Sequence, residues 1–309
     1  MKVVVMGAGA VGCYYGAMLA RAGCDVTLIG RSGLVAAVQD GGLHLHTQSF
    51  QARVPIAAAT DAAAARGADI VLLCVKAADT AAAGLSLAPH LAVGTPVLCL
   101  QNGVDNAARL RAVLPAASVV PAAVYAAVEM VGAGRVRHHG GGELVIGPAP
   151  GIAAFADACA HAGVPVRISA NVAGELWTKL IVNCCFNPMS AITRLPYGPM
   201  LQGAGAWDVM RDVAAECLEV ARAEGIAPAG DPWQALQRIA RTMPAQISSM
   251  AQDIGRGRPT EIDYLNGYIV RRGEELGVHT PVNRALQALV KLLEPGRAAP
   301  APSPAIGRA

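Results

Sequence analysis

The chain has 309 residues, of which 53% are hydrophobic and 15% charged, and its formal net charge is +3. This composition excludes a disordered protein, and so small and scattered a positive charge gives no reason to expect nucleic acid as a partner. The length suits about two domains. No apolar run reaches the roughly 20 residues of a membrane span, and no signal peptide is recognisable, so we expect a cytoplasmic protein without a membrane partner.

The cysteines and histidines do not suggest a metal site. The eight cysteines lie mostly in apolar runs without a C-x-x-C pair, and the seven histidines lack an H-E-x-x-H pattern. Such cysteines are typical of small buried side chains in a reducing compartment. The sequence therefore predicts neither a disulfide framework nor a bound metal.

A glycine-rich segment follows the first predicted strand. Residues 3–5 form a β-branched run typical of a buried parallel strand, a helical pattern then extends to about residue 22, and residues 25–29 read as a second strand. G-x-G-x-x-G in this position indicates a dinucleotide-binding βαβ unit, because its glycines allow a tight turn, approach of the pyrophosphate and close helix packing. The predicted cofactor contacts are Gly7, Ala8, Gly9, Ala10, Val11 and Gly12.

The end of the second strand bears on the choice of cofactor. NAD-binding chains carry an acidic residue near this place to hold the ribose 2′-hydroxyl, whereas this chain reads Gly30-Arg31-Ser32. A guanidinium suits a 2′-phosphate, so Arg31 favours NADP(H) over NAD(H). The alternative is an arginine that merely faces solvent.

Two further strands end in polar residues. Residues 69–75 lead to Lys76, and residues 96–100 lead to Gln101-Asn102-Gly103. Because ligands bind at the carboxyl ends of parallel strands, we expect Lys76 and Asn102 beside the cofactor, with simple strand-end caps as the alternative. Further extended segments are predicted as a hairpin or an irregular extension over 43–56 and as late strands over 143–147 and 164–168.

After residue 170 the strand patterns give way to helical ones. They cover about 172–192, 206–224, 231–251, 260–276 and 282–294. We therefore expect an α/β protein with a Rossmann-type domain over 1–170 and an all-α domain over 171–294. The proline-rich residues 295–309 are predicted to be a disordered tail.

The first of these helices carries a polar stripe in an apolar run. Lys179, Asn183 and Asn187 are each four residues apart, which places them on one helix face at intervals of about 6 Å. An ammonium group among apolar neighbours loses hydration, and this lowers its pKa toward values useful for proton donation. A solvated lysine at the helix edge is the alternative. Pro188 also predicts a helix end at Asn187.

Two later segments combine polar groups with helix termini. Ser248 and Ser249 place two hydroxyls together near a helix end. Thr260 with Asp263 resembles a capping box at the start of the next helix. In that setting Glu261 could be only a first-turn acid that the helix dipole favours.

These motifs occur in one order along the chain: the glycine fingerprint, Lys76, Gln-Asn102-Gly, the polar stripe, Ser-Ser249-Met-x-Gln-Asp and Thr-Glu261-Ile-Asp-Tyr-x-Asn-Gly. In this order they resemble the ketopantoate reductase (2-dehydropantoate 2-reductase) family over almost the whole chain. The resemblance implies a helical domain like the C-terminal domain of 6-phosphogluconate dehydrogenase. It also implies that NADPH reduces a 2-oxo acid to a 2-hydroxy acid, specifically 2-dehydropantoate to pantoate in pantothenate and coenzyme A biosynthesis.

The resemblance also implies roles for the catalytic and substrate-binding residues. The lysine that matches Lys179 is the general acid, and Glu261 either holds that lysine or orients a ribose hydroxyl. The residues that match Asn183, Asn187 and Ser249 hold the substrate.

Further roles concern the cofactor. The residues that match Asn102 and Glu261 lie beside the nicotinamide and its ribose, and Asn102 also faces the substrate. Arg31 and Lys76 match positions near the adenosine phosphate, and Ala127 falls at a backbone contact to the cofactor.

The chain departs from the family pattern at two positions. Tyr197 stands where a further asparagine grips the far end of the substrate, and Gln246 also replaces an asparagine. These departures leave open a different branched or bulkier 2-oxo acid. A catalytically silent NADP(H)-binding sensor is a third reading, which Lys179, Ser249 and Glu261 argue against. The apolar helical domain could also pair with a second copy to form a homodimer.

Overall fold

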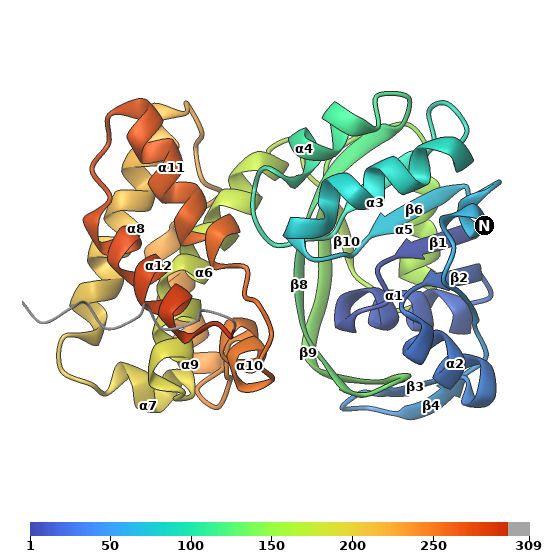
Figure 1. Ribbon diagram of the computed structural model, residues 1–309, viewed down its shortest axis with the longest axis horizontal. Helices are drawn as coiled ribbons and strands as arrows, with labels where there is room; N and C mark the ends of the chain where they lie inside the picture. Colours follow the sequence, from blue (N-terminus) through green and yellow to red (C-terminus); the bar gives the residue numbers. More distant parts are fainter. Residues whose placement is uncertain (296–309) are drawn as a thin grey trace, which may run out of the picture. The chain divides into compact units, whose positions relative to one another are not determined.

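The computed structural model describes residues 1–295, so the predicted tail over 295–309 lies, but for its first residue, outside the described part (Figure 1). The chain divides into two compact units. Unit 1 comprises Met1–Leu180 and Gly225–Asp231, and unit 2 comprises Ile181–Glu224 and the described residues from Pro232 onward. The division therefore falls within helix α6 (Val172–Thr193), and a domain boundary at residue 170 remains a prediction.

Unit 1 is built on a sheet in which the described residues form ten strands. Their order is β4-β3-β9-β8-β7-β6-β1-β2-β5, and β10 pairs with β9. The pairs from β5 through β2, β1, β6 and β7 to β8 are parallel, whereas β8 and β9 are antiparallel. The strands are β1 (Lys2–Met6), β2 (Asp25–Ile29), β3 (Leu43–His46), β4 (Gln51–Val54), β5 (Ala57–Ala59), β6 (Ile70–Leu73), β7 (Pro96–Cys99), β8 (Ser118–Gly132), β9 (Arg135–Ile146) and β10 (Val166–Ile168).

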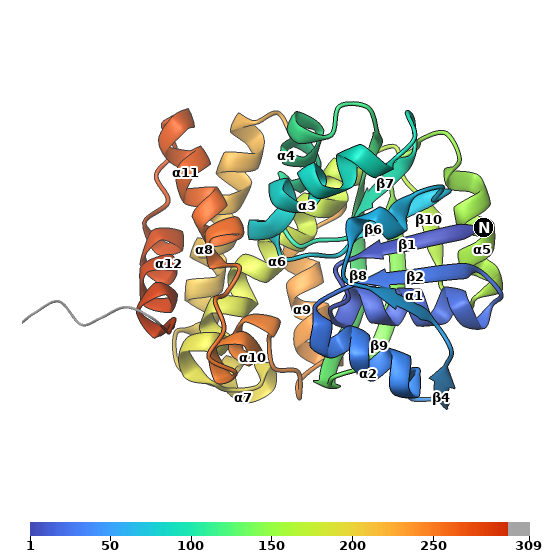
Figure 2. The same ribbon diagram turned by 45° about the vertical axis from the view of Figure 1, so that its right-hand side comes forward.

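Helices cover both faces of the parallel strands, which explains their continuous apolar sequences. Val3 and Val5 pack on the side of α1 and α5, and Val4 packs on the side of α3 and α4. Figure 2 shows β6, β1 and β2 side by side in this arrangement. The helices of unit 1 before α6 are α1 (Ala10–Arg21), α2 (Ser32–Gly41), α3 (Thr80–Leu87), α4 (Asn106–Val113) and α5 (Ile152–His161), with 3₁₀ turns η1 (Ala62–Ala65), η2 (Ala77–Asp79) and η3 (Ala88–His90).

The antiparallel part of the sheet was only partly predicted. The expected hairpin over 43–56 is confirmed, because β3 and β4 pair antiparallel. The late strand expected over 143–147 is instead the end of the twelve-residue strand β9, and its fifteen-residue partner β8 was not predicted. The glycine run at 140–142 lies inside β9 at irregularities in the pairing, and such a run reads as a loop in sequence.

Unit 2 is helical throughout its described residues, as predicted. It contains the second half of α6, then α7 (Tyr197–Leu201), α8 (Ala206–Ala223), α9 (Pro232–Thr242), α10 (Ser249–Gly255), the 3₁₀ turn η4 (Ile262–Tyr264), α11 (Asn266–Leu276) and α12 (Pro281–Leu293). The continuous helix predicted over 231–251 is wrong: α9 ends before Pro244, whose ring cannot continue a helix.

The helix predicted over 260–276 begins later, at Asn266, and the capping box is wrong. The Thr260 hydroxyl accepts from the Ile262 amide at 3.2 Å and donates to Glu294 Oε1 at 2.7 Å. Asp263 instead accepts from Gln287 at 2.9 Å. These bonds attach the segment before α11 to α12, so it serves a tertiary contact instead of a helix start.

None of the described helices is both long and apolar enough to cross a membrane. Within the same residues, no group of histidine, cysteine, aspartate or glutamate side chains is placed to hold a metal ion.

Candidate cofactor and substrate site

The glycine loop has the shape that a pyrophosphate requires. Gly7 has φ +105°, and a Cβ there would lie 2.5 Å from the Val75 nitrogen. A Cβ on Gly12 would lie 2.3 Å from the Gly7 oxygen, so helix α1 can approach the strand only without a side chain at this position. A Cβ on Gly9, by contrast, would meet no atom within 4 Å. The loop is therefore closed on the protein side and open at Gly9, where the first turn of α1 presents its amides.

The predicted loop residues surround this opening. Ala8 lies between the two glycines, and its amide donates to the Ile29 oxygen at 3.1 Å. Ala10 and Val11 form the first turn of α1, whose N-cap residue, Gly9, has no capping side chain. The N–H groups of this turn suit an anionic ligand.

Arg31 and Lys76 flank the glycine loop. Arg31 is the exposed N-cap residue of α2, just after β2, and the exposed Lys76 lies three residues after the end of β6. Since β2, β1 and β6 are adjacent and parallel, the loop and these two cations follow the same ends of three neighbouring strands. This arrangement fits a nucleotide that carries several phosphates.

Asn102 follows the next strand, β7, and a buried polar network holds its backbone. The Asn106 side chain donates to the Asn102 oxygen at 2.7 Å. The Thr80 hydroxyl lies 3.2 Å from Asn106 Oδ1 and accepts from Gln101 Nε2 at 2.8 Å. Neither Thr80 nor Asn106 stands out in the sequence, and Gln101 does so only as a neighbour of Asn102. The only local signal was a second asparagine four residues after the first.

Ala127 lies at an irregularity in the β8–β9 pairing. It is half-buried opposite Gly140, between two shifts of register. A Cβ on Gly141 would lie 2.2 Å from the Tyr125 oxygen, so the bulge requires glycine. Beside this bulge the ring of Tyr14 from α1 stacks on the ring of His138, with ring centroids 4.5 Å apart. Burial of the His138 imidazole lowers its pKa.

Helix α6 begins on the sheet of unit 1. The Asn171 side chain accepts from the Gly174 amide at 3.0 Å, as an N-cap does. Leu176 packs with Ala123 and Val145, which fixes the first turns against β8 and β9. Lys179 is half-buried one turn beyond Glu175.

Glu175 binds two groups at the start of this helix. Its carboxylate accepts from Arg167 at 2.8 Å and from the Tyr125 hydroxyl at 3.3 Å. Burial, with the adjacent Glu175 charge, raises the pKa of Tyr125 to about 12. Tyr125 therefore stays protonated at neutral pH and donates to Glu175.

Pro188 does not end the helix, contrary to the expectation from the Asn-Pro pair. α6 runs to Thr193 with Pro188 inside it. Proline lacks the N–H that would donate to the Cys184 oxygen four residues earlier. The Asn266 side chain supplies that donor instead, with Nδ2 at 3.1 Å from the Cys184 oxygen. A distant side chain thus compensates for the missing N–H.

Asn266 is itself part of a buried network. It has 0% exposure, and its Nδ2 also lies 2.9 Å from Asn283 Oδ1. Asn283 donates from Nδ2 to Glu216 at 2.7 Å, and the backbone amides of Val282 and Asn283 donate to the same carboxylate. Glu216 therefore caps α12 and connects it with α8. In the sequence the Asn-Gly pair at 266–267 is visible only as part of a family motif, with no sign of this network.

The other predicted substrate residues lie near the end of α6 or on neighbouring elements of unit 2. Asn183 is half-buried, and Asn187 is 4% exposed. Ser249 is the exposed first residue of α10, whereas the buried Ser248 caps that helix and donates to the Asn187 oxygen at 3.2 Å. Glu261 is half-buried and precedes η4.

The two departures from the family pattern occur in one place. The Tyr197 amide donates to the Gln246 oxygen at 3.0 Å. Tyr197 is 8% exposed, its ring centroid lies 4.4 Å from that of Phe186, and burial raises the pKa of its phenol. A buried aromatic ring thus stands where the family pattern has an amide.

Two family descriptions match the chain: "Ketopantoate reductase PanE/ApbA" over residues 3–151, and "Ketopantoate reductase PanE/ApbA C terminal" over residues 171–294. The chain belongs to the ketopantoate reductase family. It is 33% identical to the 2-dehydropantoate 2-reductase of Halobacterium salinarum over 95% of this chain and 99% of that protein. It is 31% identical to the 2-dehydropantoate 2-reductase of Vibrio cholerae, over 95% of this chain and 98% of that protein.

Solved structures give the same result. A PanE/ApbA family ketopantoate reductase from Ralstonia eutropha JMP134 is 56% identical, with a TM-score of 0.92 over 95% of this chain and 98% of that one. A D-mandelate dehydrogenase, solved with NADH and anilino(oxo)acetate, is 26% identical, with a TM-score of 0.88 over 95% and 98%. Together with the family match, these structures confirm the predicted fold, a Rossmann-type domain with a helical C-terminal domain.

Proposed function

We propose that the protein reduces 2-dehydropantoate to pantoate with NADPH, and that Lys179 is the general acid. The observation that carries this proposal is the polar stripe of α6. In a member of the ketopantoate reductase family, one uninterrupted helix bears Lys179, Asn183 and Asn187 at one-turn intervals. The proposed setting is the cytoplasmic synthesis of pantothenate and coenzyme A, and a homodimer is the proposed assembly.

The phosphates of the cofactor would be held by unit 1 residues at the carboxyl ends of its parallel strands. The open space at Gly9 and the amides of α1 suit the pyrophosphate. Arg31 stands where NAD-binding chains have an acid, and its guanidinium with Lys76 suits a 2′-phosphate. Asn102, the backbone at Ala127 and Glu261 complete the proposed contacts.

In the proposed reaction NADPH, when bound, supplies a hydride to the carbonyl carbon of the 2-oxo acid. Negative charge then grows on the carbonyl oxygen, and the ammonium of Lys179 donates a proton there. The amide groups of Asn183 and Asn187, with the hydroxyl of Ser249, hold the substrate so that this oxygen stays within reach of the lysine. Glu261 holds the lysine or a ribose hydroxyl.

A steady-state assay with NADPH and a panel of 2-oxo acids tests the proposal. We expect the highest kcat/KM for 2-dehydropantoate, measured as oxidation of NADPH, and a lower value with NADH. Absence of turnover for every member of the panel would refute a reductase and favour the NADP(H)-binding sensor.

A second candidate substrate is a bulkier or aromatic 2-oxo acid. Tyr197 buries an aromatic ring against Phe186 where the family pattern has an amide. The similarity to a D-mandelate dehydrogenase points in the same direction. In the same panel, a higher kcat/KM for phenylglyoxylate than for 2-dehydropantoate would select this candidate.

A further inference from the structure

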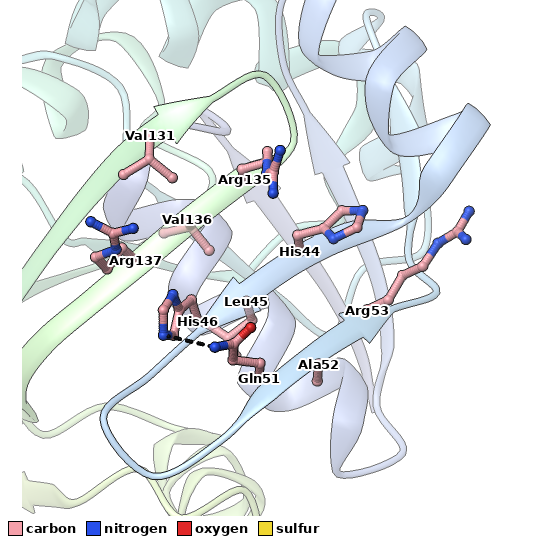
Figure 3. A pocket seen from close by; sticks show the side chains of 10 residues that line it. All are labelled: His44, Leu45, His46, Gln51, Ala52, Arg53, Val131, Arg135, Val136 and Arg137. Carbon is pink, nitrogen blue, oxygen red and sulfur yellow. Dashed lines mark hydrogen bonds between the residues drawn. The ribbon is translucent and has the colours of Figure 1, made fainter.

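Unit 1 contains a hollow that none of the proposed cofactor or substrate contacts lines. Its volume is about 440 Å³, and it lies over β3, β4 and β9 beside the end of β8 (Figure 3). Leu45 and Val136 are 1% exposed because they face the core from these strands, so the alternate residues of the strands point outward. The lining consists of His44, Leu45, His46, Gln51, Ala52, Arg53, Val131, Arg135, Val136 and Arg137.

The strand register arranges the polar lining residues in two rows. In the first row His44 lies between Arg53 of β4 and Arg135 of β9. In the second row His46 lies between Gln51 and Arg137. Consecutive rows on one face of a sheet are roughly 7 Å apart, and neighbouring strands are about 4.8 Å apart. Donors from three strands therefore gather over a short distance.

The hollow holds cationic groups without a matching acid. No carboxylate lines it, and within the described residues neither Arg135 nor Arg137 forms an ion pair or a side-chain hydrogen bond. The carboxylate opposite Arg137 in the register, Glu129, lies 3.2 Å from His139 Nε2. Two guanidinium groups on one strand repel each other, and an anion bound between them would relieve this repulsion.

Protection of a sheet edge explains only part of this pattern. β4 is an edge strand, where an arginine such as Arg53 discourages pairing with another chain. Arg53 also donates to the backbone oxygens of Asp40 and Gly41. Arg135 and Arg137, however, lie where β9 is paired on both sides, with β3 and with β8, so neither residue stands at a free edge.

The hollow is separate from the proposed cofactor contacts. Strands β9, β8, β7 and β6 stand between β3 and β1 in the sheet order. Arg53 bonds to the last turn of α2, whereas Arg31 precedes its first turn. A helix of this length spans about 15 Å.

We propose that this hollow binds a short polyphosphate chain, with Arg135 and Arg137 as its main donors and His44 and His46 as secondary ones. Guanidinium groups bind phosphate oxygens in a bidentate manner. Two rows of donors suit a chain of several phosphates better than a single phosphate. Apart from the imidazoles of His44 and His46, the lining has no aromatic ring on which a base could stack, so recognition rests on the phosphates. This site does not depend on the proposed reductase activity.

Calorimetric titration of the NADPH-saturated protein with tripolyphosphate tests the site, because saturation blocks the cofactor's own phosphate contacts. We expect one saturable site per chain and binding of orthophosphate about tenfold weaker or more. Arg135→Gln/Arg137→Gln should weaken tripolyphosphate binding at least tenfold. The matched control, Arg222→Gln/Arg238→Gln, removes the same charge from exposed helix positions and should bind as the wild type does.

Thermal unfolding provides a second readout. Since the side chains of Arg135 and Arg137 form no hydrogen bond or ion pair within the described residues, their replacement should not lower the melting temperature, while tripolyphosphate should raise it only in the wild type and the control. The proposal would be overturned if Arg135→Gln/Arg137→Gln bound tripolyphosphate as tightly as the control Arg222→Gln/Arg238→Gln does. Equal affinity of the wild type for orthophosphate and tripolyphosphate would also overturn it. ATP distinguishes the source: binding as tight as tripolyphosphate indicates a nucleoside triphosphate, and much weaker binding indicates free polyphosphate.

Discussion

In unit 1 the proposed cofactor residues follow the ends of adjacent parallel strands, whereas in unit 2 the polar face of α6 depends on side chains from distant helices. The glycine loop is shaped by its own backbone and that of neighbouring strands. The region around Pro188 instead needs Asn266, which lies 82 residues from Cys184 in sequence. Local backbone geometry therefore shapes the glycine loop of unit 1, and long-range side-chain bonds support α6 in unit 2.

The largest expected effect concerns Lys179. Lys179→Ala should lower kcat by about 100-fold or more, because the developing negative charge would lose its proton donor. The affinity for NADPH, measured by fluorescence titration, should be unchanged, since the glycine loop does not depend on this side chain. Nearly normal turnover would remove Lys179 from the mechanism.

The dependence of α6 on distant bonds can be tested with a double-mutant cycle. Asn266→Ala leaves the Cys184 and Asn283 oxygens without their donor, and should lower the free energy of unfolding by about 3 kcal/mol. Pro188→Ala restores the backbone N–H to the Cys184 oxygen. In that background the cost of Asn266→Ala should be smaller by about 1 kcal/mol.

Urea denaturation measures the free energy of unfolding with and without Asn266→Ala in both backgrounds. A suitable control is Pro281→Ala, because a proline in the first turn of a helix replaces no hydrogen bond. This control should not reduce the cost of Asn266→Ala. Equal costs in the wild-type and Pro188→Ala backgrounds would show that Asn266 does not replace the missing N–H.

Two glycines of the loop separate packing from ligand binding in unit 1. Gly12→Ala places a Cβ 2.3 Å from the Gly7 oxygen and should destabilise the protein by about 2 kcal/mol. Gly9→Ala meets no atom within 4 Å and should unfold like the wild type, yet bind NADPH about tenfold more weakly. Unfolding curves measure the loss of stability in Gly12→Ala, and NADPH titrations measure the loss of affinity in Gly9→Ala. Wild-type NADPH affinity in Gly9→Ala would reject the proposed pyrophosphate position.

The smallest effect should come from the exposed cation beside the loop. Arg31→Asp should lower the ratio of kcat/KM for NADPH to that for NADH by about tenfold, because a carboxylate repels a 2′-phosphate and accepts from a 2′-hydroxyl. Arg222→Asp, far along the chain, serves as the control. An unchanged ratio would mean that Arg31 does not contact the 2′-phosphate.

The sequence predicted the fold class well because its main signals are local. The strand and helix periods around the glycine motif, the hairpin at 43–56 and the helices α6, α8 and α12 were all recognisable. The long strand β8 was missed because its Ala- and Val-rich residues show no alternation, and the glycines of β9 resemble a loop. The structure of the segment before α11 depends on Glu294, so its short-range pattern gave the wrong helix start.

The proposed site was identified at the level of motifs but not of supporting bonds. Lys179, Asn183 and Asn187 were visible because four-residue spacing is a local property. The bonds of Asn266 and Ser248 were not, because each residue acts on a backbone oxygen of α6 more than 60 residues earlier. A single sequence contains no sign of which carbonyl a distant side chain will reach.

The uninterrupted course of α6 has a consequence for how this chain can change. Lys179 lies in unit 1 and Asn183 in unit 2, yet they are one helical turn apart. Inserting one residue between them would rotate every later side chain by about 100° about the helix axis, and would move Asn183 and Asn187 away from the face that bears the ammonium. The segment from 179 to 187 therefore keeps its three polar side chains on one face only if its length does not change.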